Sequence, residues 1–308
     1  MTVTNTEKQD APNGEIALCI LSAINWGAFD NPRDMRESCH LAVRALDELI
    51  DYQDYPMEEA KYSATNRRTL GIGIINFAYW LAKNDLRYDA KALPVVDLWA
   101  QHWSYYLLEA SIELAKEKGP CALFSETRYS QGLLPVDTYK RDVDDLVAPV
   151  DYVNWDSLRI KLSKYGIRNS TLMALMPAET SAQIANATNG IEPPRSYVTK
   201  KVSRNVIINQ VVPELTTLKG KYDLLWDNFS LDGYLKITAV LQKYIDQAIS
   251  VNTSYVPRRY PNGQLPTSVL LKDILNFYKY GGKLLYYNNT DDGQGEVATE
   301  DDCDSCKI

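Results

Sequence analysis

Apolar residues recur along the chain at two spacings, and each spacing predicts a different kind of element. Short apolar runs that suit buried strands occur at 16–21, 68–75, 171–176 and 283–287. Apolar residues three and four apart predict helices between these runs, at 32–50, 76–83, 95–118, 234–249 and 267–280, with another opening at 177. Strands that alternate with helices in this order predict an α/β fold.

Local signals mark several of these elements. Asn31-Pro32 offers an N-cap followed by proline at the first helical position. Gly119-Pro120 and Gly281-Gly282 end two of the predicted helices. The run RTLGIGII at 68–75 interleaves glycine with apolar residues, which is typical of a strand that another backbone approaches closely.

Charge divides the chain into a body and two polar ends. The formal net charge is -7, and seven acids lie between Asp291 and Asp304, with Lys307 the only base after Lys283. We therefore predict a disordered polar leader at 1–12, a nearly neutral folded body at 13–288 and a mobile acidic tail at 289–308. A broad nucleic-acid surface is not expected, because phosphate binding needs clustered Lys and Arg.

Composition excludes other classes of protein. No uncharged apolar run reaches the roughly 18 residues of a membrane span, and the amino terminus lacks the apolar core of a secretory signal, so a cytoplasmic chain is expected. Five cysteines in such a compartment predict reactive or buried thiols instead of a disulfide framework. With two histidines, neither a His-based triad nor a complete zinc site is expected.

The first candidate for chemistry is the pair Cys303 and Cys306 near the carboxy terminus. Two thiols at this spacing can close a small disulfide, and a mobile tether gives them a high effective concentration at any disulfide within reach. Half of a metal site, or incidental tail cysteines, would give the same pattern. The residues alone leave these readings open, although missing companion ligands favour a redox relay over metal.

The second candidate is the strand-to-helix junction Pro177, Ala178, Glu179, Thr180 and Ser181. Free amide groups at a helix start, with two hydroxyls beside them, suit a phosphate group. An ordinary capped helix with an acid in its first turn has the same pattern. By pattern alone, the ordinary helix is favoured.

Tyrosine and cysteine supply the remaining candidates. Tyr286 and Tyr287 could pass a radical, but the chain has 21 tyrosines, among them the adjacent helical pair Tyr105-Tyr106. Neighbours on a regular strand point to opposite faces, so the pattern alone favours packing. Cys19 lies on a predicted buried strand and, like Cys39 and Cys121, has the pattern of a small core residue.

Seven motifs together resemble the class I ribonucleotide reductase large subunit, of the enterobacterial and T-even phage type. The resemblance runs from about residue 13 to the end and covers the carboxy-terminal portion of that family. Its motifs are NGEIALC at 13–19, LAVRALDELIDYQDYP at 41–56, RRTLGIGIINFAYWLAK at 67–83, IRNSTLMALMPAETS at 167–181, NATNGIEPPR at 186–195, and LLYYNNT followed by a terminal C-x-x-C-K-I.

The resemblance implies a role for each candidate. Cys19 matches the active-site cysteine that becomes half of a disulfide, and 177–181 matches the segment that holds the substrate phosphates. Tyr286 and Tyr287 match a stacked pair that relays a radical, which requires the backbone to depart from a regular strand. Cys303 and Cys306 match the tail pair that re-reduces the site and is recharged by thioredoxin or glutaredoxin, at a shorter spacing than in the enterobacterial relative.

The implied fold is a ten-stranded α/β barrel made of two five-stranded halves. This chain would supply much of the second half, a small appended subdomain and the redox tail. A half-barrel exposes strand edges and apolar faces, so self-association alone and docking with the missing half are expected. The thiyl-radical cysteine, the second disulfide cysteine and the effector sites of the family lie upstream of the resemblance, and with Met1 and an unrelated leader this indicates a split-gene product.

The implied activity is reduction of ribonucleoside diphosphates, in a complex with the N-terminal half and the small (beta) subunit. The radical would come from the di-iron tyrosyl centre of the small subunit, so no metal or bound cofactor is expected on this chain. Glycyl-radical enzymes share the barrel, but the chain lacks their glycine loop and has the tyrosine pair and the dithiol. An inactive remnant or a non-catalytic assembly partner stays open as an alternative.

Overall fold

The computed structural model describes residues 2–3, 14–202 and 207–291. The strands are β1 (Thr2–Val3), β2 (Ile16–Ala17), β3 (Ile20–Asn25), β4 (Leu70–Ile75), β5 (Val198–Val202), β6 (Ile207–Val211), β7 (Val251–Tyr255) and β8 (Leu285–Thr290). The helices are α1 (Arg36–Tyr52), α2 (Glu58–Arg67), α3 (Phe77–Lys83), α4 (Leu93–Lys118), α5 (Pro135–Thr138), α6 (Trp155–Tyr165), α7 (Glu179–Ile184), α8 (Leu215–Leu218), α9 (Leu231–Gln242) and α10 (Thr267–Lys279).

Parallel strands form the centre of the fold. β3 pairs in parallel with β4, and β4 continues through the bridge Ile72–Met173 to the extended segment 171–175. That segment is bridged through Leu175 to Ile249, just before β7, and β7 pairs in parallel with β8. The predicted α/β class is confirmed. Among the described residues these strands form an open row and do not close into a barrel.

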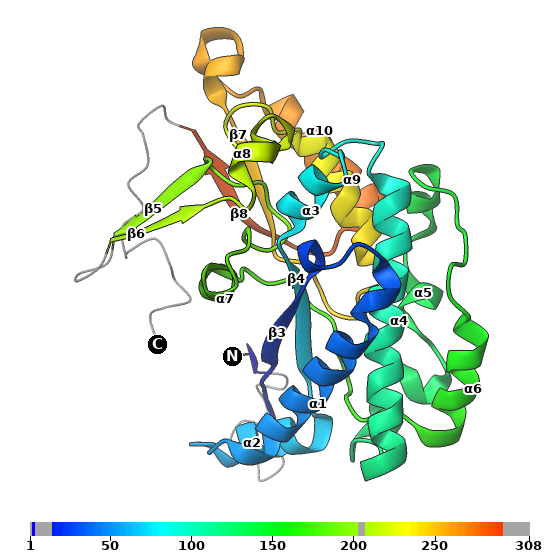
Figure 1. The fold of residues 1–308 in the computed structure, drawn as a ribbon. Coiled ribbons are helices and arrows are strands. Elements are labelled where there is room, and N and C mark those ends of the chain that lie inside the picture. Colours follow the sequence, from blue (N-terminus) through cyan, green and yellow to red (C-terminus); the bar gives the residue numbers. More distant parts are fainter. Residues whose placement is uncertain (1, 4–13, 203–206, 292–308) are drawn as a thin grey trace.

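Helices pack against this row on the side seen at the right of Figure 1. The long helix α4 contacts α1, α6 and α9, so it is buried on nearly all sides. Trp99 of α4 joins Trp26 and Trp80 in an aromatic cluster whose ring centroids lie 5.0–5.5 Å apart. Offset and edge contacts of this kind stabilise a core beyond the area that they bury. The outer helices therefore hold the strands in place from one side.

The predicted helix boundaries agree with the structure to within four residues, except at the carboxyl end of α9. Asn31 accepts a hydrogen bond from the backbone N–H of Arg33 at 2.9 Å, as expected of an N-cap, but it opens a short 3-10 turn ahead of α1. The predicted helix 234–249 ends at Gln242, so its last residues were assigned wrongly. The predicted strand 16–21 is split into β2 and β3, and the β5–β6 hairpin and β7 were not predicted.

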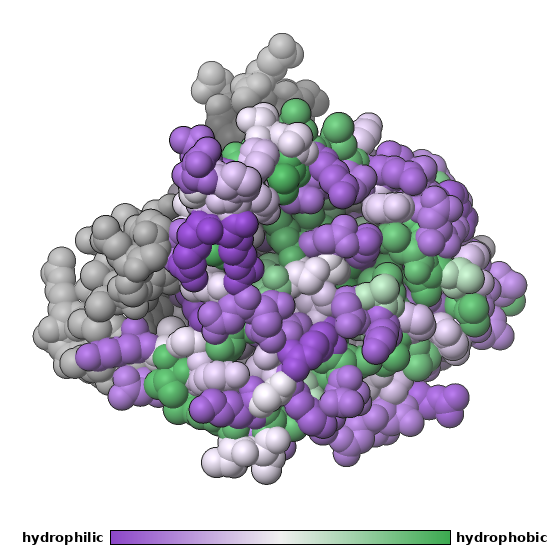
Figure 2. Space-filling view, turned by 90° about the horizontal axis from the view of Figure 1, so that it is seen from above, coloured by the Kyte–Doolittle hydropathy of each residue, from purple (hydrophilic) through white to green (hydrophobic). Residues whose placement is uncertain are grey.

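Hydrophobic and hydrophilic residues are intermixed on the upper face of the molecule (Figure 2). Larger exposed apolar side chains occur near the strands, where Leu21 of β3 is 51% exposed and Ile184 of α7 is 86% exposed. No helix within the described ranges is long and apolar enough to cross a membrane.

Candidate functional site

The ends of β3 and β4 meet a turn at 186–190, and Asn76 joins all three. Asn76 follows β4 directly and has a left-handed backbone, with φ 65°. Its side-chain amide donates to Asn25 Oδ1 at 3.0 Å, and its Oδ1 accepts the backbone N–H of Thr188 at 2.9 Å. Because ligand sites of parallel sheets lie beyond the carboxyl ends of the strands, this junction forms the wall of a candidate site. Sequence reasoning missed Asn76.

The segment 177–181 lies at the same edge, after the extended segment 171–175. Helix α7 begins at Glu179, and its N-cap residue Ala178 has no side-chain oxygen to satisfy the first amides. The backbone N–H of Ala178 instead donates to Asn189 Oδ1 at 2.9 Å. The side chains of Pro177, Glu179, Thr180 and Ser181 are all exposed. The predicted ordinary cap is therefore not observed at this helix start, and both hydroxyls are accessible.

Cys19 lies one residue before β3, with its side chain exposed. A Cβ atom added to Gly71 would come within 2.7 Å of its sulfur, and one added to Gly73 would lie 3.0 Å from the sulfur of Met176. Positions 71 and 73 share one face of β4, since side chains alternate along a strand. The two glycines thus make room for Cys19 and Met176 on one face. The backbone oxygen of Ala174 would also lie 3.0 Å from a Cβ on Gly73, which confirms the predicted close approach of another backbone.

The Cys19 thiol keeps its proton at neutral pH. Desolvation by the surrounding protein, with a smaller contribution from the charge of Asp246, raises its pKa to about 12. A thiolate is the form that attacks as a nucleophile. The raised pKa of Cys19 therefore leaves little thiolate at neutral pH, which makes this thiol poorly suited to attack as a nucleophile unaided. Cys39 and Cys121 are buried core residues, as predicted.

Tyr286 and Tyr287 place their rings against each other. The ring centroids are 4.3 Å apart, with planes inclined by 57°. The helical pair Tyr105-Tyr106 is looser, with centroids 5.8 Å apart and nearly perpendicular rings. Tyr286 is 49% and Tyr287 44% exposed, so the close pair lies at the surface of the described structure.

A β-bulge explains how neighbours on one strand can meet. Val251 pairs with Leu285 and Thr253 with Asn288, so two steps along β7 correspond to three steps along β8. The additional residue of β8 falls at the tyrosine pair, and a bulge turns consecutive side chains toward the same side. The expected departure from a regular strand is therefore confirmed.

Cavities lie both at the junction and away from it. A small cavity of about 20 Å³, enough for one water molecule, lies beneath Met176, Pro177 and Asn189. Hollows of about 740 and 580 Å³ occur among the outer helices, the first lined by His40, Glu113 and Lys161 and the second by Gln101 and Lys243. We place the candidate site at the junction, because the outer hollows contain none of the predicted residues.

Cys303 and Cys306 lie outside the described residues. Within the described ranges, no group of three or more His, Cys, Asp and Glu side chains could hold a metal ion.

Comparison with known proteins identifies the family. The family described as "Ribonucleotide reductase, barrel domain" matches residues 2–223. The ribonucleoside-diphosphate reductase alpha subunit of Haemophilus influenzae is 54% identical over 301 residues, which are 96% of this chain and 40% of the relative. The Escherichia coli subunit is 52% identical over 84% of this chain and 35% of its own length, and the Enterobacteria phage T4 subunit 42% identical over 98% and 41%. The chain thus spans about 40% of the length of these relatives. It belongs to the ribonucleotide reductase family and corresponds to the carboxy-terminal part of the alpha subunit.

Proposed function

We propose that this chain supplies the carboxy-terminal part of a ribonucleoside-diphosphate reductase that acts in the cytoplasm. The observation that carries the proposal is the tyrosine pair, whose ring centroids lie 4.3 Å apart on a bulged strand. Packing alone does not require a bulge at two half-exposed rings. A radical relay does require two oxidisable rings in contact.

Each candidate then has a distinct task. The first-turn amides and hydroxyls of 177–181 bind the substrate diphosphate. Cys19 provides one of the two thiols that reduce the substrate. Tyr286 and Tyr287 carry the radical inward from the di-iron tyrosyl centre of a small subunit, so no cofactor is bound by this chain. Cys303 and Cys306 renew the active-site dithiol and are themselves recharged by thioredoxin or glutaredoxin.

The remainder of the site comes from a second part of the enzyme. The structure describes one strand beside β3, namely β4, and no second one on its other edge. Near that edge Leu21 and Cys19 are exposed, and Ile184 protrudes from α7. An open edge beside exposed apolar side chains favours pairing with further strands. We infer that an N-terminal half completes a ten-stranded barrel here.

The reaction has a balanced electron count in this arrangement. A thiyl radical on the N-terminal half removes the 3′ hydrogen of the ribose, and the 2′ hydroxyl leaves as water. Two thiols, one of them Cys19, give up two electrons and two protons and become a disulfide. The 3′ hydrogen then returns to the sugar and regenerates the thiyl radical. The high pKa of Cys19 keeps the required proton on the sulfur until that step.

Reconstitution tests the proposal as a whole. Neither this chain alone nor its mixture with the small subunit should reduce a ribonucleoside diphosphate. Addition of the N-terminal half should produce turnover, measured as deoxyribonucleoside diphosphate formed with thioredoxin as the reductant. Stable three-component assembly without any turnover would instead indicate the non-catalytic assembly partner.

A covalent link between the two halves is expected from the position of Cys19. The test uses enzyme with Cys303→Ser and Cys306→Ser, so that the tail cannot reduce the active-site disulfide. After a single turnover without external reductant, a non-reducing gel should show the two polypeptides joined by a disulfide. Cys19→Ser should abolish the link, whereas Cys121→Ser, which changes a cysteine that is 2% exposed, should retain it. If enzyme with both tail cysteines replaced turns over once without forming the link, Cys19 is not half of the active-site disulfide.

A further inference from the structure

The bulge at the tyrosine pair needs a hydrogen-bond acceptor that a regular ladder does not provide. The residue of β7 that faces the extra residue of β8 is Asn252, between Val251 and Thr253. Its side-chain oxygen accepts the backbone N–H of Tyr287 at 3.0 Å. The Asn252 amide therefore substitutes for a ladder carbonyl at the point where the register shifts.

A second contact fixes which way the Asn252 amide faces. Its Nδ2 donates to Glu192 Oε1 at 2.6 Å. With the nitrogen held by that carboxylate, the oxygen must face Tyr287. Burial raises the pKa of Glu192 to about 6, which agrees with a carboxyl group enclosed beside the strands.

Glu192 also lies beside the junction of the turn 186–190 with the ends of β3 and β4. It follows the turn 186–190 and lines the small cavity together with Met176, Pro177 and Asn189. Asn189 in turn accepts the backbone N–H of Ala178 at 2.9 Å. A continuous row of contacts thus leads from the segment 177–181 through Glu192 and Asn252 to Tyr287.

We propose that Asn252 and Glu192 are positioning residues that hold Tyr286 and Tyr287 in contact and tie them to the phosphate-binding segment. That they set ring geometry stands on the contacts alone. That they thereby support radical transfer rests on the proposed function. Neither residue touches the reacting atoms in this scheme.

The test separates these two parts by using two measurements on Asn252→Ala. A crystal structure of the full-length variant should show the ring centroids well beyond 4.3 Å, because Tyr287 loses the acceptor that fixes the bulge. In the reconstituted enzyme kcat should fall about 10- to 100-fold, since displacements near 1 Å have effects of this size, while KM for the diphosphate stays within about twofold. A change in KM with kcat at the wild-type value would contradict a role in positioning the tyrosines for radical transfer.

Glu192 provides a matched series that does not depend on how well the Asn252 variant folds. Glu192→Gln keeps an oxygen to accept from Asn252 and should retain both ring contact and kcat. Glu192→Leu removes the acceptor and should separate the rings and lower kcat. Thr253→Val removes a neighbouring contact between the same strands, Thr253 Oγ1 to Asn288 Oδ1 at 3.1 Å, and should change neither quantity.

Each remaining outcome decides one part of the proposal. Rings that stay in contact in Asn252→Ala and Glu192→Leu overturn the positioning role. Rings that separate while kcat is unchanged overturn its link to radical transfer. If the two variants separate the rings but the reconstituted wild-type enzyme never turns over, the positioning role stands and the proposed function is rejected.

Discussion

Replacing Asp47 by alanine should lower the free energy of unfolding of this chain by about 3–5 kcal/mol. Asp47 lies in α1 and is completely buried. Its carboxylate accepts from Arg68 Nε at 2.6 Å and from Arg168 Nε at 3.1 Å. Alanine would remove the counter-charge that Arg68 and Arg168 share and would leave Arg68 with the half-exposed Asp51. Loss of one partner from a buried charge network is among the costliest local changes in a protein.

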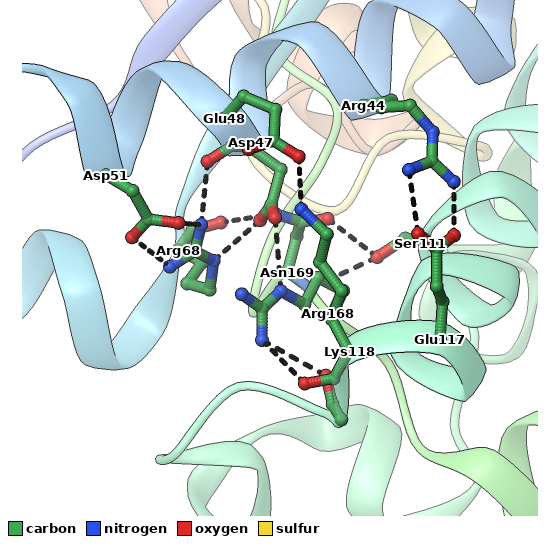
Figure 3. Close-up of polar contacts among 11 residues, drawn as sticks. Arg44, Asp47, Glu48, Asp51, Arg68, Ser111, Glu117, Lys118, Arg168 and Asn169 are labelled. Carbon is green, nitrogen blue, oxygen red and sulfur yellow. Dashed lines mark hydrogen bonds and ion pairs between the residues drawn. The ribbon is translucent and has the colours of Figure 1, made fainter.

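The geometry of the Asp47 network shows why its loss should spread (Figure 3). Asn169 donates to Asp47 Oδ1 at 3.2 Å and to the backbone oxygen of Arg68 at 2.9 Å. It also binds Ser111 of α4, whose hydroxyl donates to Asn169 Oδ1 at 2.8 Å. Arg68 precedes β4, and Asn169 precedes the segment 171–175. The network therefore fixes the starts of two adjacent strands against α1 and α4.

Arg68 itself has a strained backbone that the network sustains. Its φ of 51° places it in the left-handed region, which costs a non-glycine residue of the order of 1–2 kcal/mol. The side chain offsets this cost through Asp47 and through Asp51, which accepts from it at 2.8 and 2.9 Å. When Asp47 is removed, the strain remains and part of the compensation is lost.

Urea unfolding followed by circular dichroism would measure the effect of Asp47→Ala. The matched control is Glu117→Ala, which removes the partner of Arg44 in a pair where both side chains are about half exposed. Water can replace that contact, so the change should be far smaller. Equal losses of unfolding free energy in Asp47→Ala and Glu117→Ala would show that burial of the Asp47 network adds nothing to its contribution to stability.

Elements defined by local sequence could be predicted, and α4 shows why. Its apolar residues recur at helical spacing, and Gly119 follows with φ +84°, a conformation that favours glycine. The predicted range 95–118 therefore differs from the observed Leu93–Lys118 only at its start. Both the periodicity and the stop signal lie within the segment itself.

Elements decided by distant partners could not be predicted in this way. The apolar spacing of 234–249 continues past Gln242, yet the chain leaves the helix there. Asp246 then accepts the backbone N–H groups of Leu172 and Met173 at 2.8 and 2.9 Å, across more than 70 positions of sequence. The sequence around Asp246 does not indicate that its carboxylate accepts hydrogen bonds from a distant segment.

The candidate site likewise has one part that local sequence predicts and another part that depends on distant residues. The segment 177–181 and the glycines beside Cys19 lie in recognisable local motifs. The bulge that brings Tyr286 and Tyr287 together depends on a count of residues in β7 against β8, which neither strand contains alone. Asn76, Asn189 and Asn252 act through side-chain amides at turns and register shifts, where asparagine is too common to stand out.

Tyr287→Phe should abolish turnover of the reconstituted enzyme, with kcat at least about a hundredfold lower, a rise in barrier of at least about 2.7 kcal/mol. Phenylalanine has no phenolic proton to release and is far harder to oxidise than tyrosine, so the radical cannot pass. The ring itself is retained, and with 44% of Tyr287 exposed the missing hydroxyl should leave folding nearly unchanged. Diphosphate binding should therefore persist, which equilibrium dialysis would measure beside the steady-state rate.

The chain contains a matched control for this loss in its second adjacent tyrosine pair. Tyr105→Phe and Tyr106→Phe change rings whose centroids are 5.8 Å apart in α4, remote from β7 and β8 in Figure 1. Both variants should keep the wild-type rate, whereas Tyr286→Phe should fail as Tyr287→Phe does. If Tyr287→Phe turned over normally in a fully assembled enzyme, the close contact on β8 would be packing, and the radical would have to enter by another route.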